Sequence, residues 1–200
     1  EGGMVCTNDL EVYQQVRMMR SHGMVREADE EAVKVSFQQD NPDLNPQFIF
    51  AYPAFNLRNT EIGGIMGLSQ LRRLDANVER RTDNLHRFLS QIDPHKYRTD
   101  FKVKGSSNYA FNLVMKEPDA DFVGRLMKRM TESGIEFRRG SSGGGNQIRQ
   151  PYLKRLLPQC DPEQFPEVEH VHFYGFYIGN FPDLKDEEID EICAILNSVE

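Results

Sequence analysis

The apolar residues between positions 60 and 91 recur every three or four residues, and this periodicity constrains the fold more than any other feature of the sequence. Such spacing places the apolar side chains on one stripe of an α-helix, which must pack against a partner surface. We therefore predict one helix of about eight turns, straight or bent. Gly63 and Gly64 leave room for close backbone packing, and five arginines are expected on a solvated or subunit-facing side. The apolar positions are Ile62, Ile65, Leu68, Leu71, Leu74, Val78, Leu85, Phe88 and Leu89, and the arginines are Arg72, Arg73, Arg80, Arg81 and Arg87.

The segment before this helix combines an expected strand, an expected helix and a long polar stretch. The apolar run at residues 4–7 is predicted to form a buried strand. A helix should begin at Asn8 or Asp9, either of which can cap it, and should end at the glycine of the Ser-His-Gly segment. Residues 24–46 are polar and acidic and are expected to form a long lid or binding loop. The aromatic stretch at 48–59 should lie on another surface as an ordered connector.

After residue 100 the pattern alternates strands with helices. Strands are predicted at 108–115, 135–138 and 173–180, long helices at 119–133 and 186–199, and short helices at 152–157 and 166–172. Alternation of this kind is typical of an α/β domain. We therefore predict an α/β fold whose small sheet contains both parallel and antiparallel pairings.

Composition describes a globular chain and argues against two classes of partner. The formal net charge is −7, whereas general nucleic-acid binding needs a basic surface. No apolar run approaches the roughly 18 residues needed to cross a membrane. The cysteines Cys6, Cys160 and Cys193 are odd in number, far apart and without CxxC spacing, so we expect free thiols in a reducing cytoplasm.

A glycine-rich loop at 138–149, RRGSSGGGNQIR, is the stretch best suited to ligand binding. Its four glycines would let a ligand approach the backbone N–H groups, as in an anion-binding nest. Three flanking arginines could grip a phosphate bidentately. The loop is not a Walker motif, because no Lys-Ser/Thr follows, and not GxGxxG, because Ile148 occupies the third glycine position. A ligand loop and a flexible surface loop with incidental charge are both compatible with this composition.

Histidines offer weaker candidates. His170 and His172 share a face only if their segment is a strand, and no third ligand is in sight, so we do not expect a metal site. His22 lies at a helix end, where the helix dipole favours a cation, and both capping and a site role are compatible with that place. No Ser-His-Asp or Cys-His arrangement and no carboxylate pair stands out for catalysis.

Three short motifs in register carry a resemblance to a known family. The chain reads EGGMVCTND at 1–9, RSHG at 20–23 and FNLRNTEIGGIMGLSQLRRLD at 55–75. In this order and spacing they resemble the DegT/DnrJ/EryC/StrS sugar aminotransferase family of fold-type I pyridoxal-phosphate enzymes. Each motif is weak alone, but three in register are specific, and the resemblance covers essentially all 200 residues.

The resemblance implies the C-terminal portion of a fold-type I enzyme. Residues 1–56 would be the end of the large cofactor domain with an active-site loop, and residues 57–200 the linking helix and small C-terminal α/β domain. The cofactor would be pyridoxal 5'-phosphate or pyridoxamine 5'-phosphate. Members hold it with a residue shortly before the Glu-Gly-Gly motif, so we expect that residue upstream of Glu1. No lysine of the chain can be assigned to this role, no catalytic residue is expected within it, and the chain alone is expected to be inactive.

The second half resembles one branch of the family. GGGNQIRQPYL at 143–153, followed by FYGFYIGN at 173–180, is similar to the nucleotide-linked 4-keto-6-deoxyhexose 3-dehydratases, in which a histidine replaces the lysine. Their reaction removes the 3-hydroxyl of the sugar, with the cofactor as electron sink and the histidine as acid and base. Aminotransferases share many of these segments. The resemblance therefore implies a 3-dehydratase or an aminotransferase of deoxysugar, polysaccharide or lipopolysaccharide biosynthesis.

Carried over residue by residue, the resemblance implies two groups of binding residues. Asn56 would reach the cofactor phosphate of the partner subunit, with Arg58 beside it, and His22 would lie near the active-site mouth of that partner. These roles imply a homodimer with shared active sites in a cytoplasmic enzyme. The nucleotide-sugar substrate would be met by His22 and by Arg139, Asn146, Arg149, Tyr177 and Asn180.

A second hypothesis is a non-catalytic module that binds a nucleotide sugar or serves dimerisation. The abrupt start of the chain argues against it, since an independent module should have its own N-terminus and a closed sheet. Neither hypothesis involves nucleic acid, a metal or a membrane.

Overall fold

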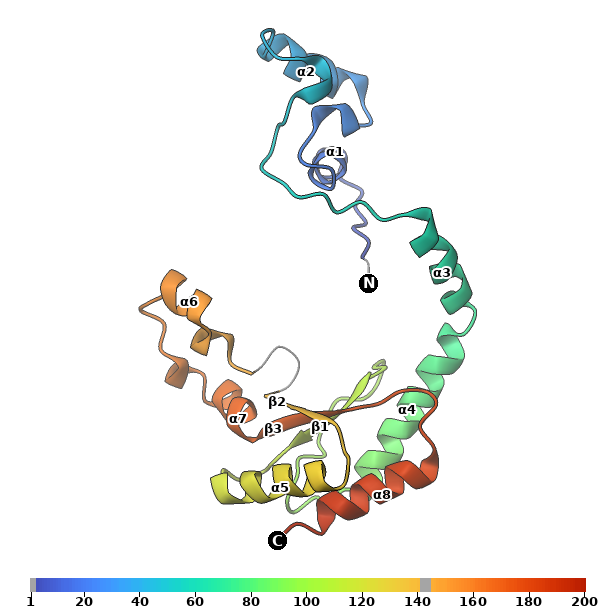
Figure 1. The fold of residues 1–200 in the computed structure, drawn as a ribbon, viewed down its shortest axis with the longest axis vertical. Helices are drawn as coiled ribbons and strands as arrows, with labels where there is room; N and C mark the ends of the chain where they lie inside the picture. Colours follow the sequence, from blue (N-terminus) through green and yellow to red (C-terminus); the bar gives the residue numbers. More distant parts are fainter. Residues whose placement is uncertain (1–2, 141–144) are drawn as a thin grey trace. The chain divides into compact units, whose positions relative to one another are not determined.

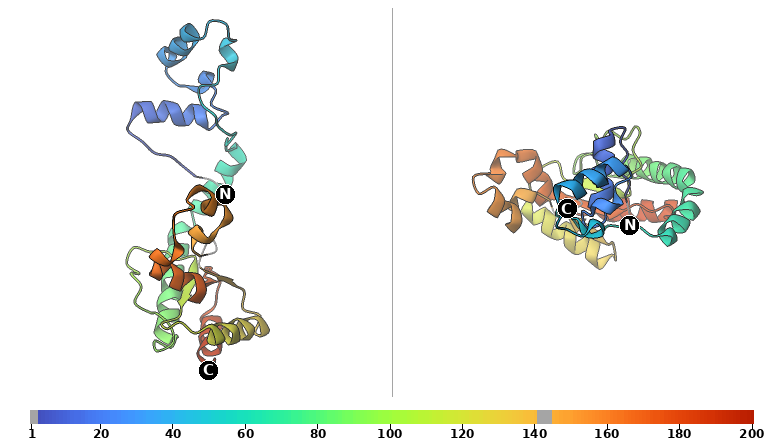
Figure 2. Two further views of the ribbon diagram at one scale, coloured as in Figure 1. Left: turned by 90° about the vertical axis from the view of Figure 1, so that its left-hand side faces the viewer. Right: turned by 90° about the horizontal axis from the view of Figure 1, so that it is seen from above.

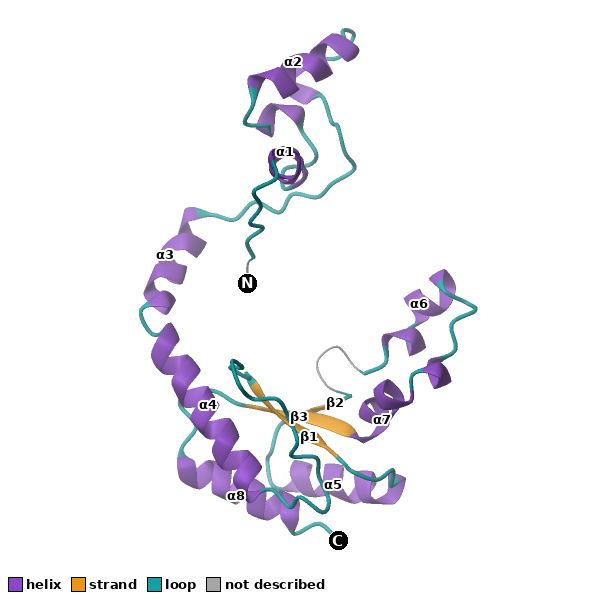
Figure 3. Cartoon of the chain, turned by 180° about the vertical axis from the view of Figure 1, so that it is seen from behind, coloured by secondary structure: helices purple, strands orange, loops and turns teal. Residues whose placement is uncertain are grey.

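The computed structural model describes residues 3–140 and 145–200. The chain divides into two compact units, residues 1–72 and residues 73–200, and each has a buried core of its own. Figure 1 labels the helices and strands of both units. Figure 3 shows that the strands lie in the second unit, whereas the first consists of helices and loops.

Unit 1 begins with the predicted helix. The carboxylate of Asp9 caps α1 (Leu10–Met19) by accepting hydrogen bonds from the backbone N–H groups of Glu11 and Val12, at 2.9 and 3.1 Å. The capped start predicted from the sequence is therefore confirmed. The other elements of this unit are a 3-10 turn at Val25–Glu27, α2 (Glu31–Asp40), a 3-10 turn at Pro46–Phe48 and α3 (Glu61–Leu71).

Two expectations for unit 1 are wrong. Residues 3–7 form no strand, and Met4 is 90% exposed. A strand needs a hydrogen-bonded neighbour, and none of the described segments pairs with these residues. Residues 24–46 are not one long loop either, because α2 lies within them. Val33 and Phe37, four residues apart, pack on the core of the unit, a helical signal that the polar composition concealed.

The core of unit 1 is small and orders the aromatic connector. Met18, Val25, Ala28 and Ile49 form it. The connector at 48–59 runs beside the residues that follow α1, with isolated bridges that join Ser21 to Asn56 and Met24 to Phe50. The connector is ordered, as expected, because this pairing and the buried Ile49 hold it.

The long helix predicted over residues 60–91 is interrupted at Arg72 and Arg73, so that α3 is followed by a separate helix, α4 (Leu74–Gln91). The two segments do not share one packed face. α4 buries Leu85 and Phe88 in the core of unit 2, while α3 buries none of its residues. The apolar periodicity therefore identified both helices but not the break between them.

Unit 2 is the predicted α/β fold, built on a three-stranded sheet in the order β1-β3-β2. β3 lies in the middle and pairs antiparallel with both neighbours. The expected mixture of pairings is wrong: β1 and β2 run parallel to each other, as a helical crossover allows, but β3 separates them. The elements are β1 (Ala110–Val114), α5 (Ala120–Glu132), β2 (Phe137–Arg139), α6 (Pro151–Leu156), α7 (Pro166–Tyr174), β3 (Gly175–Gly179) and α8 (Asp186–Asn197).

Three helices cover one face of this sheet. α5 and α8 lie beneath the strands, and α4 packs against α8 (Figure 1; Figure 2). The ring of Phe88 from α4 stacks on Phe111 of β1, with centroids 4.5 Å apart and planes 7° from parallel. Leu126 of α5 and Ile189 of α8 are fully buried in the same core. Each helix thus contributes one apolar stripe to a single core.

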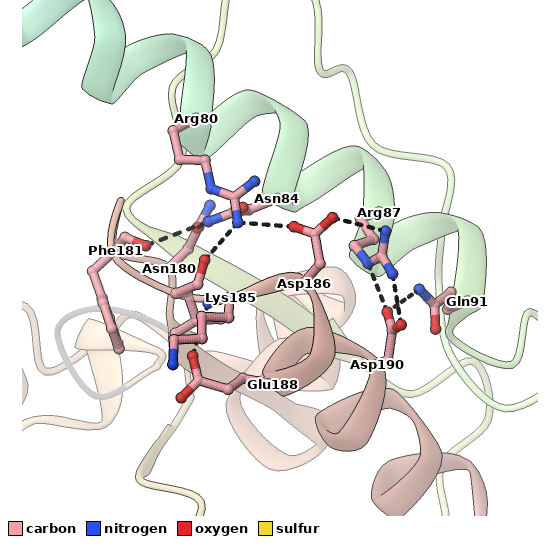
Figure 4. A network of polar contacts seen from close by, with 11 residues as sticks. Arg80, Asn84, Arg87, Gln91, Asn180, Phe181, Lys185, Asp186, Glu188 and Asp190 are labelled. Carbon is pink, nitrogen blue, oxygen red and sulfur yellow. Dashed lines mark hydrogen bonds and ion pairs between the residues drawn. The ribbon is translucent and has the colours of Figure 1, made fainter.

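Ion pairs hold α8 against α4 (Figure 4). Arg80 donates to Asp186 at 2.8 Å, and Arg87 donates to Asp186 at 3.1 Å and to Asp190 at 2.6 Å. Hydrogen bonds from Arg87 and Gln91 hold the pKa of the Asp190 carboxyl below its usual value. These two arginines therefore serve the fold of their own unit, which corrects the expectation of a solvated or subunit-facing side.

The side chain of Asn180, just after β3, connects three segments and is 1% exposed. Its Nδ2 donates to the carbonyl oxygens of Arg81 and Asn108, both at 2.9 Å, and its Oδ1 accepts from Asn84 Nδ2 at 3.0 Å. Its backbone N–H donates to the carbonyl of Tyr109 at 2.8 Å. One residue therefore joins α4, the approach to β1 and the end of β3.

Asn180→Ala should lower the free energy of unfolding by roughly 2–4 kcal/mol, because it leaves several buried polar groups unpaired at about 1–3 kcal/mol each. Chemical denaturation measures this difference. Asn77→Ala is the control: Asn77 lies on α4, its side chain forms no hydrogen bond with a described residue, and stability should change by less than about 0.5 kcal/mol. Equal effects of the two substitutions would contradict the role of Asn180.

Candidate functional site

The segment that ends α1 folds back tightly on the aromatic connector. His22 has a φ of 59° and Gly23 a φ of 77°. A Cβ on Gly23 would lie 2.0 Å from the carbonyl oxygen of Tyr52, so only glycine fits there. The backbone N–H of His22 donates to the carbonyl of Phe55 at 3.0 Å. A positive φ at a non-glycine residue is uncommon and often marks a functional position.

This fold brings together the three site residues predicted in unit 1. Asn56 is exposed, and its amide makes no hydrogen bond to any described residue. Arg58 donates to the hydroxyl of the buried Ser21 and to Glu27 Oε1, the latter at 2.7 Å. Because Ser21 pairs with Asn56 and precedes His22, the three predicted residues lie around one turn of the chain.

The chemistry of this cluster suits an oxyanion such as a cofactor phosphate. An exposed amide and a guanidinium are good hydrogen-bond donors to a phosphate. Arg58 would have to divide its donors between the carboxylate of Glu27 and the phosphate. The only lysine of residues 1–72, Lys34, lies on α2 and pairs with Glu31 at 3.3 Å. The cluster therefore provides phosphate donors, and it does not include a lysine amine.

The glycine-rich loop of unit 2 is described at both ends. Residues 141–144, including Gly143 and Gly144 of the predicted anion-binding nest, lie outside the described residues. Gly145 has a φ of 81°, and a Cβ there would lie 2.3 Å from Nδ1 of His172. The loop is thus closely packed against α7 at this point.

Glu169 of α7 gathers the predicted residues Asn146 and Arg149. Asn146 is 2% exposed, and its Nδ2 donates to Glu169 Oε1 at 2.7 Å. Arg149 donates to both oxygens of Glu169, with Nε contacts at 2.8 and 2.9 Å. Hydrogen bonds from Arg149 and then from Asn146 lower the pKa of Glu169 to about 2. Both predicted substrate residues are therefore tied to this carboxylate.

The two histidines of α7 also bond within the unit. Nδ1 of His172 accepts a hydrogen bond from the backbone N–H of Asn146 at 3.1 Å. Nε2 of His170 lies 2.6 Å from the carbonyl oxygen of Met115. Because a carbonyl oxygen can only accept, Nε2 of His170 must carry the proton in this contact. Over the described parts of the chain, no group of three potential ligands could hold a metal ion.

Arg139 and Tyr177 lie on opposite faces of the sheet. The register pairs Tyr177 with Asn112 and with Arg138, so these three side chains share the face away from the core. Arg139 belongs to the other face and donates to the carbonyl of Phe173 at 3.3 Å. Sequence reasoning selected Arg139 and missed Arg138, because only the register decides which neighbour faces which way.

A hollow of ≈ 630 Å³ beside β2, β3 and α8 was not predicted. Tyr177 and Arg138 line it, together with Tyr109 and Phe181. Asn180 does not line it, since its side chain is buried among its partners. The aromatic residues of FYGFYIGN and the neighbouring Arg138 were the available sequence signal, but the residues from α8 join them only in the folded unit.

A model of the DegT/DnrJ/EryC1/StrS aminotransferase family matches residues 1–197. The chain belongs to this family, as its motifs predicted. Two similar curated proteins are the GDP-4-keto-6-deoxy-D-mannose 3-dehydratases of Yersinia pseudotuberculosis and of Escherichia coli O55:H7, which are 27% and 25% identical over 197 residues. Each match covers 98% of this chain, and the chain spans about half the length of these relatives, 49% and 50%.

Solved structures share the fold. A putative sugar aminotransferase from Streptococcus pneumoniae in its PMP form matches with a TM-score of 0.72 at 18% identity, over 96% of this chain and 46% of that chain. The Escherichia coli GDP-4-keto-6-deoxy-D-mannose 3-dehydratase with bound hydrated PLP matches with a TM-score of 0.72 at 22% identity, over 95% and 48%. The predicted α/β fold class is confirmed, since the chain shares its fold with these structures and covers about half of their length. Among the described helices, none is long and apolar enough to cross a membrane.

Gly23→Ala should destabilise unit 1 by at least about 1 kcal/mol, because alanine disfavours the left-handed conformation and its Cβ would meet Tyr52. Gly124→Ala is the matched control: it lies inside α5 with nothing within 4 Å, and it should stabilise by about 0.5–1 kcal/mol. Thermal unfolding of both variants measures this, and a neutral Gly23→Ala would contradict the tight turn.

Glu169→Gln should lower stability most at pH values above the usual carboxyl pKa of 4.5. The folded pKa is depressed, so the stabilising contribution is present above that value and is lost as the pH falls toward about 2. The difference between wild type and variant should therefore shrink over this window in denaturation curves. Glu167→Gln, in an exposed pair with Arg98, is the control and should show little difference at any pH.

Proposed function

We propose that the protein carrying this chain is a pyridoxal- or pyridoxamine-phosphate-dependent enzyme that acts on a nucleotide-linked 4-keto-6-deoxyhexose. The observation that carries the proposal is the family match over residues 1–197, together with two 3-dehydratases among the similar proteins. The reaction would be a 3-dehydration or an amino transfer in deoxysugar, polysaccharide or lipopolysaccharide biosynthesis. The cofactor would supply the electron sink.

The dehydratase is the favoured form of this proposal. Two similar proteins, 27% and 25% identical to the chain, are named as 3-dehydratases. A histidine at the position that meets the cofactor would support dehydration, and a lysine there would support amino transfer. A non-catalytic module is not favoured, because the match extends over both units of the chain.

Within this function, unit 1 would bind the cofactor phosphate. Asn56 is suited to donate its free amide, Arg58 to share its guanidinium between Glu27 and the phosphate, and His22 to present its ring beside them. On unit 2, Tyr177 would contact the nucleotide sugar, whereas Arg139, on the opposite face of the sheet, would act as a positioning residue through its bond to the carbonyl of Phe173. Asn146, Arg149 and Asn180 would act mainly as positioning residues, since each is bonded within the unit.

We also propose a homodimer with shared active sites. The support is α3, whose large apolar side chains are 62–70% exposed and are not buried by any described residue of their own unit. Apolar surface of this extent is usually covered in an assembly. A cytoplasmic enzyme fits Cys6, Cys160 and Cys193, none of which forms a disulfide. The exposed residues of α3 are Ile62, Ile65, Met66, Leu68 and Leu71.

Asn56→Ala in the protein of full natural length should weaken cofactor retention without changing the melting temperature, because the amide makes no bond within the described residues. Cofactor absorbance after dialysis measures retention, and Asn8→Ala, also exposed, is the control.

Residues 1–200 alone should show no turnover of a 4-keto-6-deoxyhexose nucleotide, since no cofactor-holding residue is assigned within them.

Mixing tests the shared site. Asn56→Ala subunits combined with subunits inactivated at the cofactor-holding position should recover up to about a quarter of wild-type activity by random pairing. If subunits exchange and no activity returns, Asn56 does not act across a dimer.

A further inference from the structure

The two histidines of α7 make hydrogen bonds of opposite sense. Nε2 of His170 donates to the carbonyl oxygen of Met115, and a ring that carries one proton or two can make this bond. Nδ1 of His172 instead accepts from the backbone N–H of Asn146, and only a ring without a proton on that nitrogen can do so. A second proton therefore leaves the contact of His170 intact and removes the contact of His172.

The contact of His172 lies where the glycine-rich loop meets α7. A Cβ on Gly145 would lie 2.3 Å from Nδ1 of His172 and 3.1 Å from its Cα, so the loop backbone is packed directly on this residue. An imidazolium would direct an N–H group at the N–H of Asn146, and the close packing leaves the backbone no room to turn away in place. Protonation of His172 must therefore displace the backbone at residues 145 and 146.

The backbone of Asn146 is connected to Arg149. Oδ1 of Asn146 accepts from the backbone N–H of Ile148 at 3.0 Å and so caps the 3-10 turn Gln147–Arg149. Nδ2 of Asn146 and the guanidinium of Arg149 both donate to Glu169. A displacement of Asn146 is therefore passed to Arg149 through the turn and through the shared carboxylate.

Glu169 stays ionised over the pH range in which a histidine titrates. It lies three residues before His172 on α7 and interacts with it electrostatically. Hydrogen bonds from Arg149 and then from Asn146 lower the pKa of Glu169 to about 2. Imidazoles gain their second proton between about pH 8 and pH 5. Over that range a positive charge on His172 would also compete with Asn146 and Arg149 for this carboxylate.

The other charged groups around this part of α7 come from the loop, from β2 and from the 3-10 turn just before α7. Arg149 lies over the ring of Phe173, with Cζ 5.0 Å from the centroid, and Arg139 donates to the carbonyl of Phe173 at 3.3 Å. Asp161 and Glu163 act electrostatically on Arg149. α5 also contacts α7, but none of its charged side chains bonds with a described residue of α7. Guanidinium groups and carboxylates ordinarily keep their charges between pH 5 and 8, so a histidine is the group that changes.

We propose that His172 is a pH-sensitive positioning residue of the enzyme proposed above. While its ring is neutral, it holds residues 145–149 on α7 and keeps the glycine-rich loop in the arrangement that substrate binding requires. When the ring takes a second proton, the bond to Asn146 is lost and the loop leaves α7. The role in substrate binding rests on the proposed function, whereas the pH-sensitive contact does not.

Amide hydrogen exchange of the protein of full natural length tests the contact. Mass spectrometry with fragmentation that resolves the amide of Asn146 gives its protection factor, in which the intrinsic pH dependence of exchange is divided out. In wild type this factor should fall by about tenfold or more between about pH 8 and pH 5. His172→Asn places an amide oxygen that does not titrate near the position of Nδ1, so the factor should stay constant. His172→Leu has no acceptor and should give low protection at every pH.

Matched controls separate this contact from general effects. His95→Asn, at an exposed position outside the loop, should keep the pH dependence of wild type. Gly145→Ala should lower the protection of Asn146 at every pH, because its Cβ would meet the ring of His172. Gly105→Ala, with a φ of 77° but nothing within 4 Å of its Cβ, should leave that protection unchanged. Melting temperatures at each pH verify that the variants are folded.

Steady-state kinetics test the role in the reaction. The probe is GDP-4-keto-6-deoxy-D-mannose, the sugar nucleotide in the names of the two similar 3-dehydratases, with cofactor bound. The ratio of the KM of wild type to the KM of His172→Asn should rise by about three- to tenfold from about pH 8 to pH 5. The corresponding ratio of kcat should change little, because the loop affects binding.

The outcomes separate the contact, its role and the enzyme function. If the protection of Asn146 does not change with pH in wild type, or changes equally in His172→Asn, the pH-sensitive contact is overturned. If protection changes as expected but the KM ratio is constant, the positioning role is overturned. If the probe is not turned over, the dehydratase form of the proposed function fails and the positioning role with it, while the exchange result still decides the contact.

Discussion

The buried amide of Asn180 is the constraint on which the second unit most depends. An amide side chain has two donors and an acceptor, and here it uses both kinds to join α4 with the residues before β1. Its backbone adds the bond to Tyr109. Because Tyr109 in turn meets Tyr177 edge to face, these two rings of the hollow are held by the same residue that closes the sheet against α4. Stability and the shape of the candidate site are therefore linked through one buried polar group.

Intramolecular pairing decides which arginines are available for a ligand. Arg80 and Arg87 are occupied by carboxylates of α8, and Arg149 by Glu169. Arg138 is left with a ring for a neighbour and no counter-ion among the described residues.

Under the proposed function the two units contribute different chemistry. Unit 1 offers an amide and a guanidinium around a strained turn, where Gly23 lets the chain approach Tyr52 closely. Such groups bind a phosphate through fixed donors rather than through a lysine. Unit 2 offers the ring of Tyr177 and the guanidinium of Arg138 on the face of its sheet away from the core. The exposed apolar residues of α3 would be covered by the partner subunit in the proposed homodimer.

The sequence by itself determined the helices other than α2, the α/β class and the family, because these depend on local periodicity and on motifs read in order. The Asp9 cap and the three motifs needed no tertiary information. The break at Arg72 and Arg73, and the antiparallel place of β3, depend on which surfaces pack together, and local pattern does not encode that.

The candidate site divides in the same way. Asn56, Arg58 and His22 are close in the structure because a turn and a short bridge join them. Strand register alone puts Arg138, and not Arg139, on the same face of the sheet as Tyr177. Side chains pair when folding brings segments that are distant in the sequence close together. The tertiary structure alone therefore decided the burial of Asn146 and Asn180, and it alone formed the hollow beside α8.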